Sequence, residues 1–237
     1  MRLHRFYISN PLSLNDTSVT ISDEKLVHQW KNVFRLGKGD SVIVFNGSGK
    51  EYEAVIEDIS GSAAALEISS EQDCPAIPLP TIHVAASLIK KERFEWMVEK
   101  LTELGVTSIF PIVSERSQLK QLGIDRLVSI AKEAAEQSGR GSLPQISSPS
   151  ALKDVIGHVK GTLIIFHGDS EEMLTAAAVS DLNAKELTIF IGPEGGWGEG
   201  DLELFRRHDM KIYSLGDLTL RAETAALAAV SLMRFTK

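Results

Sequence analysis

The sequence predicts an α/β protein in which a small β-rich domain precedes a larger domain with a parallel sheet. Two observations predict this architecture. Short apolar runs with β-branched residues dominate the first 70 residues, whereas from Thr81 onward such runs alternate with stretches of helical period. With 237 residues and 43% hydrophobic content, the chain can bury these cores without disulfides or metal staples. We expect a soluble globular protein.

Residues 1–70 form the predicted β-rich domain. Asn46-Gly47-Ser48-Gly49 has the composition of a hairpin turn between its last two strands, and Ser22 is expected to open one short helix. Prolines at 75, 78 and 80 mark residues 71–80 as a linker. The expected strands are residues 5–8, 19–21, 41–45 and 51–56.

Residues 81–237 form the predicted α/β domain. A strand at 81–87 precedes a helical stripe from Phe94 to Leu104, Gly105 suits the end of that helix, and a strand at 106–113 completes a βαβ unit. Further apolar residues at helical spacing lie between Leu127 and Ala135. The last helix, Ala222 to Phe235, is rich in alanine and is expected to be buried. The remaining predicted strands are residues 162–166, 187–191 and 211–213.

Two glycine-bearing segments carry most of the functional information. They are Ile191-Gly192-Pro193-Glu194-Gly195-Gly196-Trp197 and Ser214 to Ala225, and each follows a predicted strand and precedes a predicted helix. Glycines lack the Cβ that would hold a flat ligand away from the backbone, and they allow positive φ. Because open α/β sheets bind ligands at strand ends, the two loops predict a pocket.

The sequence lacks the motifs that are typical of dinucleotide-binding, phosphate-binding and metal-binding proteins. The chain contains neither Gly-x-Gly-x-x-Gly nor a phosphate-binding Gly-x-x-x-x-Gly-Lys-Ser/Thr. Cys74 is the single cysteine, so no internal disulfide and no zinc signature is expected, and we expect no metal. The six histidines show no i,i+4 pairing, and only His167 falls at a predicted pocket loop. Without a signal peptide or a long apolar run, the expected location is the cytoplasm.

The distribution of charge along the chain is modest evidence for nucleic-acid binding. The net charge of −7 argues against a general nucleic-acid binder, because phosphate neutralisation needs clustered lysine and arginine. The distribution is uneven, however. Residues 1–50 carry seven Lys+Arg against four Asp+Glu, which leaves +3, while residues 51–87 carry none against seven. Ordinary solvated surface charge explains this pattern equally well.

Motifs along nearly the whole chain carry a family resemblance. They are the two glycine segments, Arg2 with His4-Arg5-Phe6-Tyr7, and the stretches Phe34 to Asp40, Glu99 to Val106 and Glu133 to Arg140. Together they resemble the small-subunit ribosomal RNA uridine N3-methyltransferases, within the knotted SPOUT class. Two positions depart from that pattern: Thr219 stands where isoleucine is usual, and Leu127 stands where tryptophan is common.

The resemblance implies a fold, a reaction and partners. It implies a SPOUT-type domain with a trefoil knot after a PUA-like β-barrel, a homodimer, and S-adenosylmethionine-dependent methylation of N3 of one uridine in 16S ribosomal RNA. The RNA is expected within an assembled or assembling small subunit. Two alternatives stay open. A knotted methyltransferase acting on transfer RNA would share the pocket, and a non-enzymatic RNA-binding module would explain the first 70 residues but not the glycine loops.

The resemblance also assigns residues to the cofactor. Three loops at strand ends would form the walls of its pocket. Trp197 beside them would either stack on a base or cover the pocket. The implied cofactor-binding residues are Phe166, His167, Gly168, Ile191, Gly192, Pro193, Glu194, Gly195, Gly196, Ser214, Leu215, Gly216, Leu218, Leu220 and Thr224.

Arg221 and Glu223 are the candidate catalytic residues. Arg221 opposes the dipole at a helix N-terminus, so it needs a partner: Glu194, Glu223 or an anionic substrate. We expect it to stabilise charge on the uracil oxygens. Glu223 suits the first turn of a helix for charge reasons alone, and the proton acceptor could be Glu223, Glu194 or solvent. Candidate RNA contacts, each also compatible with an ordinary surface role, are Arg2, Arg5, Arg35, Arg116 and Arg140.

Overall fold

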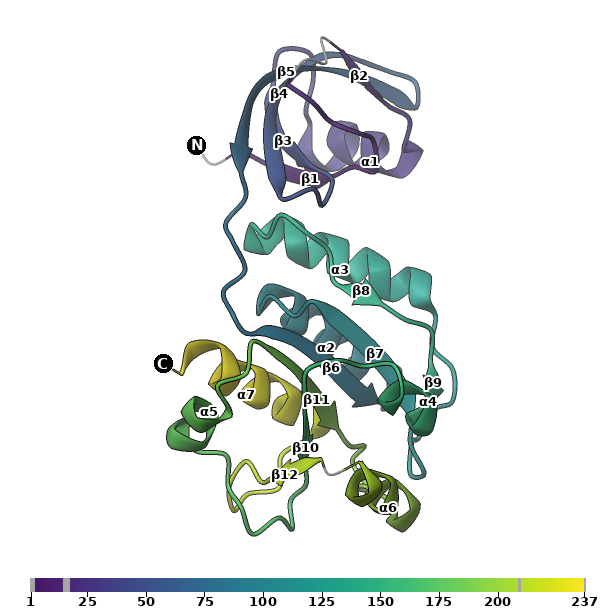
Figure 1. Ribbon diagram of the computed structural model, residues 1–237. Coiled ribbons are helices and arrows are strands. Elements are labelled where there is room, and N and C mark those ends of the chain that lie inside the picture. Colours follow the sequence, from purple (N-terminus) through teal and green to yellow (C-terminus); the bar gives the residue numbers. More distant parts are fainter. Residues whose placement is uncertain (1–2, 15–17, 209, 237) are drawn as a thin grey trace. The chain divides into compact units, whose positions relative to one another are not determined.

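The computed structural model describes residues 3–14, 18–208 and 210–236 (Figure 1). The chain divides into two compact units. The N-terminal unit comprises the residues up to Ala76 together with Ala135–Leu143, and the C-terminal unit comprises Ile77–Ala134 and the residues from Pro144 onward. The return of Ala135–Leu143 to the first unit is not anticipated by the domain limits that the sequence suggests. Arg2 lies outside the described residues.

The N-terminal unit is built on a five-stranded sheet with the order β1-β3-β4-β5-β2. β1 pairs with β3 in parallel and the other pairs are antiparallel. The predicted hairpin joins β3 to β4, which is confirmed by their antiparallel pairing. The strands are β1 (Arg5–Tyr7), β2 (Val19–Ile21), β3 (Ser41–Phe45), β4 (Lys50–Ser60) and β5 (Ala63–Asp73).

The helical part of this unit differs from the prediction in its cap. α1 (Glu24–Gln29) continues directly into a π-helix, η1 (Trp30–Phe34), whose Trp30 ring is fully buried. Asp23, not Ser22, is the N-cap, because its carboxylate accepts hydrogen bonds from two backbone N–H groups of the first turn. η1 ends at Arg35, which has a left-handed conformation with φ of 56°.

The segment Ala135–Leu143 is attached to the first strand of the N-terminal unit. Nη2 of Arg5 donates to the backbone oxygen of Gly139 at 3.2 Å. The backbone N–H of Tyr7 donates to Oε1 of Glu136 at 2.9 Å. Two hydrogen bonds between residues about 130 positions apart thus join this segment to β1.

The C-terminal unit contains an all-parallel sheet with the order β12-β10-β11-β6-β7-β8, and β9 also pairs with β7. The predicted parallel sheet is therefore confirmed. Its strands are β6 (Thr81–Ser87), β7 (Ser108–Val113), β8 (Gln145–Ile146), β9 (Ser150–Ala151), β10 (Thr162–Phe166), β11 (Glu186–Ile191) and β12 (Lys211–Tyr213). Its helices are α2 (Lys91–Glu103), α3 (Ile124–Ser138, which continues into the N-terminal unit), α4 (Leu152–Ile156), α5 (Ala176–Leu182), α6 (Glu199–Arg207) and α7 (Ala222–Phe235).

Helices cover both faces of this sheet (Figure 1). In β11, Leu187, Ile189 and Ile191 belong to the core cluster that includes residues of α2 and α7. Phe190 points to the other face, where it joins residues of α4 and α6. This alternation is what a strand buried on both faces requires. The trefoil knot stays a prediction from the resemblance. Within the described ranges, no helix is both long and apolar enough to cross a bilayer.

Arg234, near the end of α7, holds the segment that leads into the sheet. Its side chain is almost fully buried. Nη1 donates to the backbone oxygens of Pro78 and Pro80, the latter at 2.7 Å, and Nη2 donates to that of Gly105 at 3.1 Å. Burial lowers the pKa of Arg234 from its usual value. The last helix thereby fixes both the segment before β6 and the turn after α2.

Candidate functional site

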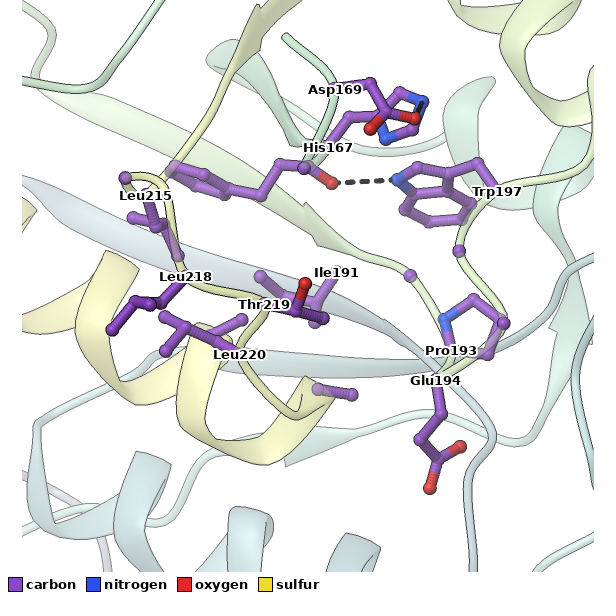
Figure 2. A pocket seen from close by; sticks show the side chains of 18 of the residues that line it. His167, Asp169, Ile191, Pro193, Glu194, Trp197, Leu215, Leu218, Thr219 and Leu220 are labelled. Carbon is purple, nitrogen blue, oxygen red and sulfur yellow. Dashed lines mark hydrogen bonds and ion pairs between the residues drawn. The ribbon is translucent and has the colours of Figure 1, made fainter.

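A cavity of about 420 Å³ opens where β10, β11 and β12 end (Figure 2). The loops after these three strands supply its walls, as the sequence predicts for ligand sites in open α/β sheets. Its lining comprises Phe166, His167, Gly168, Asp169, Ile191, Gly192, Pro193, Glu194, Gly195, Gly196, Trp197, Leu215, Gly216, Asp217, Leu218, Thr219, Leu220, Ala222 and Ala225. Of the residues that the resemblance assigns to a cofactor, Ser214 and Thr224 do not line it.

The loop after β11, from Gly192 to Trp197, is the first wall of the cavity, and Trp197 forms its inner face. Its Nε1 donates to the backbone oxygen of Phe166 at 2.9 Å, and its ring packs edge-on against Phe205 at 4.8 Å between centroids. Only 3% of Trp197 is exposed. A Cβ on Gly192 would approach the indole to 3.1 Å. Of the two roles considered for Trp197, this burial agrees with covering the pocket and not with stacking on a base.

The glycines of this wall serve different purposes. Gly196 has a φ of 69°, which favours glycine, and its N–H donates to the Pro193 oxygen at 2.9 Å to close a tight turn. Gly192 has no positive φ; its missing Cβ makes room for Trp197. A Cβ on Gly195 would meet only Arg116, at 3.7 Å. The sequence predicts a common role for all three glycines, and the structure separates them.

The outer side of the first wall is fastened to its surroundings. Arg93 Nη1 donates to Oε1 of Glu194 at 3.0 Å, and Arg116 Nη1 donates to the Gly195 oxygen at 2.9 Å. Figure 2 shows the Glu194 side chain directed away from Thr219 and the other labelled cavity residues. The loop therefore faces the cavity with one side and is held from the other.

Asp201 fastens the far end of the same loop. Its carboxylate accepts hydrogen bonds from the N–H of Gly198 at 3.1 Å and from that of Glu115, also at 3.1 Å. Oε2 of Glu115 in turn accepts from the N–H of Gly200 at 3.0 Å. Burial raises the pKa of Asp201, while the two backbone donors oppose that shift.

The second wall, from Ser214 to Leu220, is held mainly at its start. The N–H of Ser214 donates to the Glu172 oxygen at 2.7 Å, and the Ser214 oxygen accepts from the N–H of Leu174 at 2.9 Å. Beyond Gly216, whose φ is 113°, the side chain of Asp217 is exposed and Leu218 is 81% exposed, whereas Leu220 is half-buried at the cavity. Thr219 is exposed as well.

Arg221 and Glu223 lie at the mouth of α7. Arg221 is the N-cap residue and is exposed, and its guanidinium forms no ion pair or hydrogen bond with any residue that the structure describes. Glu223 is 7% exposed. Its Oε1 lies 3.8 Å from Nε of Arg93, and its Oε2 is buried without a hydrogen-bond partner among the described residues. Of the three partners considered for Arg221, Glu194 and Glu223 are both engaged by Arg93, which leaves an anionic substrate as the remaining one.

His167 is the histidine for which the sequence suggests a role at the pocket. It lines the cavity, and its Nε2 lies 4.0 Å from Oδ2 of Asp169, a largely exposed side chain. The part of the chain that the structure describes contains no cluster of three or more His, Cys, Asp or Glu side chains suited to a metal ion.

The candidate RNA-contacting arginines separate into two groups. Arg140 is buried, and the side chain of Arg5 is only 8% exposed, where its guanidinium forms an ion pair with Glu51 and packs over the Phe45 ring. RNA contact by Arg5 and Arg140 stays a prediction. Arg35 and Arg116 are exposed.

The sequence did not single out Arg93. It lies in the first turn of α2, and its acidic partners are 101 and 130 positions further along the chain, as their residue numbers show. No local pattern connects residues at such separations. The spacing of apolar residues in α2 indicates a buried face but says nothing about a polar residue beside it.

The cavity suits a nucleoside cofactor such as the resemblance implies. Its volume falls within the range of about 300–1,000 Å³ that is usual for small-molecule sites. Gly168, Gly195, Gly196 and Gly216 each leave backbone N–H and C=O groups uncovered by a Cβ, and Ile191 and Leu220 add apolar surface. A flat base could therefore contact the backbone directly.

Comparisons with known proteins agree with this geometry. Residues 76–234 match the family of RNA methyltransferase domains, and residues 31–69 match RNA methyltransferase PUA domains. The chain is 30% identical to the ribosomal RNA small subunit methyltransferase E of Rickettsia conorii, covering 99% of this chain and 96% of that protein. It is 33% identical to the protein of the same name from Synechocystis, covering 93% and 74%.

Solved structures show the same likeness. The crystal structure of a ribosomal RNA small subunit methyltransferase E from Neisseria gonorrhoeae, bound to S-adenosyl methionine, superimposes with a TM-score of 0.82 at 27% identity, covering 98% of this chain and 97% of that one. The sequence match and the structural match both extend over nearly the full chain. The chain therefore belongs to the ribosomal RNA small subunit methyltransferase E family of RNA methyltransferases.

Proposed function

We propose that the protein transfers a methyl group from S-adenosylmethionine to N3 of one uridine in 16S ribosomal RNA. One observation carries the proposal. A glycine-lined cavity at the strand ends adjoins an arginine without an ion partner, Arg221, and a buried carboxylate oxygen without a hydrogen-bond partner, Oε2 of Glu223, among the described residues. The names of the relatives, and the cofactor bound to the Neisseria protein, support the substrate and the methyl donor.

The three loops around the cavity would hold the cofactor. Backbone groups near Gly168, Gly196 and Gly216 would contact its adenine and ribose, and Ile191 and Leu220 would contact its apolar surface. S-adenosylmethionine supplies a methyl group on a positively charged sulfur, which needs no metal for its transfer. The wall held by Trp197 would exclude water from one side.

Arg221 would stabilise the negative charge that grows on the uracil oxygens as N3 loses its proton. A guanidinium suits this task because its planar fork of N–H donors can bond to a carbonyl oxygen. The donors are most effective when they do not first have to leave an ion pair. Arg221 meets that condition, since its guanidinium has no partner among the described side chains.

Glu223 would accept the N3 proton. Buried polar groups normally have a hydrogen-bond partner, so a buried carboxylate oxygen without one calls for a donor from outside the described protein. Oε2 of Glu223 is such an oxygen. Glu194 is the weaker candidate acceptor, because Arg93 already donates to it. When N3 attacks the methyl carbon, the N–C bond would form as the S–C bond breaks, S-adenosylhomocysteine would leave with the sulfur's electron pair, and the N3 proton would pass to Oε2 of Glu223.

The RNA partner would contact both units through exposed arginines. Arg35 ends η1 in the unit that matches PUA domains, and Arg116 lies beside the first cavity wall. Their exposure leaves N–H donors for phosphate groups. The target uridine must leave its stack to reach the cavity, in free RNA or in an assembled or assembling subunit.

We also propose that the protein acts as a cytoplasmic homodimer. The family resemblance implies the dimer, and Phe235 of α7 and Met173, which are 67% and 50% exposed, are apolar side chains available for such a contact. Light scattering at working concentration tests the dimer. A monomer with full methyl-transfer activity would contradict it.

The function is tested by two measurements. Calorimetry with a chelator present should show binding of S-adenosylmethionine. Mass spectrometry of ribosomal nucleosides from a deletion strain should show the loss of N3-methyluridine, and its loss from transfer RNA instead would favour a different substrate. Absence of cofactor binding, or retention of all N3-methyluridine, would contradict the proposal.

The role of Arg221 has its own test. Arg221→Ala should lower single-turnover methyl transfer by about 10²–10³-fold, because it removes one preorganised donor. Cofactor affinity and melting temperature should change little, since Arg221 has no partner to lose among the described residues. Arg221→Lys should recover part of the rate. Arg206→Ala on α6, which breaks only surface ion pairs, serves as the control.

A further inference from the structure

Arg93 joins two segments that are far apart in the sequence. Its Nη1 donates to Oε1 of Glu194, in the first cavity wall, at 3.0 Å. Its Nε lies 3.8 Å from Oε1 of Glu223, in the first turn of α7. One guanidinium on α2 therefore links the loop after β11 with the helix that begins after the second wall.

The side chains of Arg93, Glu194 and Glu223 are partly buried, which strengthens the attraction between their charges. The side chains of Arg93, Glu194 and Glu223 are 32%, 21% and 10% exposed, so the charges are only partly screened by water. Arginine suits the position, because its planar fork can present different nitrogens to two acceptors at once. Arg93 is also the cation that Glu223 meets among the described residues.

We propose that Arg93 is a positioning residue for the methyl transfer, an inference that rests on the proposed function. It fixes the first cavity wall against the start of α7. It also contacts Oε1 of Glu194 and Oε1 of Glu223, the two carboxylates that the sequence suggests as partners of Arg221, so that the exposed Arg221 guanidinium stays available for substrate. Without Arg93, the two carboxylates would lose the cation that neutralises them and would compete with the substrate for the Arg221 guanidinium.

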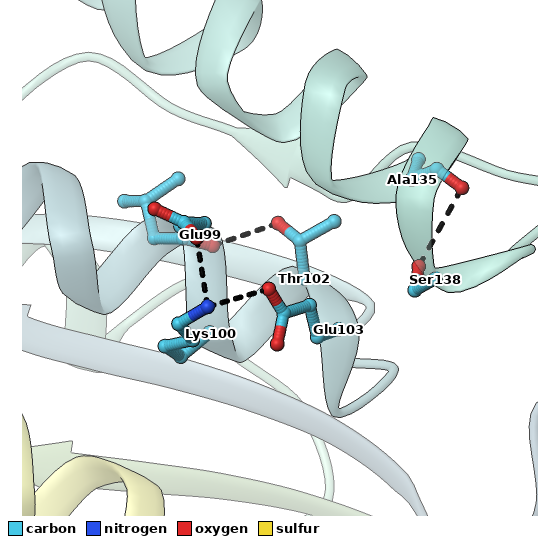
Figure 3. A network of polar contacts seen from close by, with 7 residues as sticks. Glu99, Lys100, Thr102, Glu103, Ala135 and Ser138 are labelled. Carbon is cyan, nitrogen blue, oxygen red and sulfur yellow. Dashed lines mark hydrogen bonds and ion pairs between the residues drawn. The ribbon is translucent and has the colours of Figure 1, made fainter. Parts of the chain in front are cut away.

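Lys100 provides a matched control on the same helix (Figure 3). Its Nζ donates to Oε1 of Glu99 and to Oε1 of Glu103, each at 2.7 Å. Like Arg93, it is a cation of α2 that bridges two glutamates. Both of its partners, however, belong to α2 itself. Lys100→Ala therefore removes a comparable cation without disturbing any cavity segment.

The first experiment tests positioning without cofactor or RNA. Hydrogen exchange should be measured at the amide of Gly196, which bonds to the Pro193 oxygen, and at that of Ala225, which bonds to the Arg221 oxygen. Arg93→Ala should speed exchange at both amides by about fivefold, the effect of losing a partly exposed ion pair. Lys100→Ala should change neither. Unchanged exchange in Arg93→Ala would overturn the proposal.

The second experiment tests whether Arg93 acts through Arg221. At saturating cofactor and RNA, Arg93→Ala should lower the single-turnover rate by about 10²-fold, the loss expected when a reacting group is misplaced. Arg93→Lys should recover only part of that rate. In an Arg221→Ala background, adding Arg93→Ala should cost less than threefold more, because residues that act through one another are not additive.

The outcomes separate this inference from the proposed function. If the unmodified protein neither binds S-adenosylmethionine nor transfers a methyl group, the proposed function fails, and the positioning of the two segments is decided by hydrogen exchange alone. If the protein is active but the rate reductions caused by Arg93→Ala and Arg221→Ala multiply in the double variant, Arg93 does not act through Arg221, and the proposal is overturned.

Discussion

The two glycine-bearing walls of the cavity look alike in sequence but are held very differently. The loop from Gly192 to Trp197 is fastened from behind by Arg93 and Arg116, and Trp197 closes its inner face. The loop from Ser214 to Leu220 is bonded at its first residue, and Leu218 is 81% exposed. One wall is thus preorganised, whereas the other keeps its side chains available for a ligand or a partner.

The largest expected effect is at the anchor of the first wall. Trp197→Ala should lower the free energy of unfolding of the C-terminal unit by about 3–5 kcal/mol, because it leaves a cavity in the core and an unpaired Phe166 oxygen. Leu218→Ala, in the second wall, should change it by less than about 0.5 kcal/mol. Calorimetric melting of both variants provides the comparison. Equal losses would show that the walls are held alike.

A smaller effect is expected at Asp201. Asp201→Ala removes the acceptor for the N–H groups of Gly198 and Glu115 and should lower the free energy of unfolding by about 1–3 kcal/mol. Asp217→Ala in the second wall, where the side chain is exposed, is the matched control and should be nearly neutral. Denaturant titration measures both. If Asp201→Ala is also neutral, the far end of the first wall is held by something else.

The smallest expected effect is the difference in stability between alanine substitutions at Gly195 and Gly196. Gly196→Ala places a side chain at a φ of 69° and should cost about 1–2 kcal/mol, although its Cβ would meet no protein atom within 4 Å. Gly195→Ala has no such strain, and its Cβ would make only an ordinary contact with Arg116. Melting temperature and cofactor affinity should therefore fall more for Gly196→Ala. The reverse order would mean that contact with a ligand, not backbone strain, governs this turn.

Much of the C-terminal unit could be predicted because its signals are local. The strand around Ile189 is a short apolar run, and α7 has the predicted limits Ala222 and Phe235. β5 could not be predicted in this way. Its Ala63–Asp73 sequence contains few β-branched residues, and pairing along β4 decides its conformation.

The candidate site shows the same division between local and distant causes. The glycine loops predict a cavity at the strand ends, and the cavity lies there. Which acidic residue pairs with which arginine depends on helices brought together by the fold. The sequence suggests Glu194, Glu223 or an anionic substrate as the partner of Arg221, whereas in the structure Arg93 engages both carboxylates. The burial of Arg5 against Glu51 has a similar origin, since its partner lies 46 positions away.

The return of Ala135–Leu143 to the N-terminal unit sets an order for folding during synthesis. A nascent chain begins to fold from its N-terminus as it leaves the ribosome. Here the first unit cannot form the bonds from Arg5 to Gly139 and from Tyr7 to Glu136 until more than half of the chain has been translated. The C-terminal unit cannot form the bonds from Arg234 to Pro78 and Pro80 until almost the whole chain has been translated. The N-terminal unit can therefore be completed only after Leu143 has been made, and the C-terminal unit only after Arg234, so that a product truncated before Ala135 would complete neither unit.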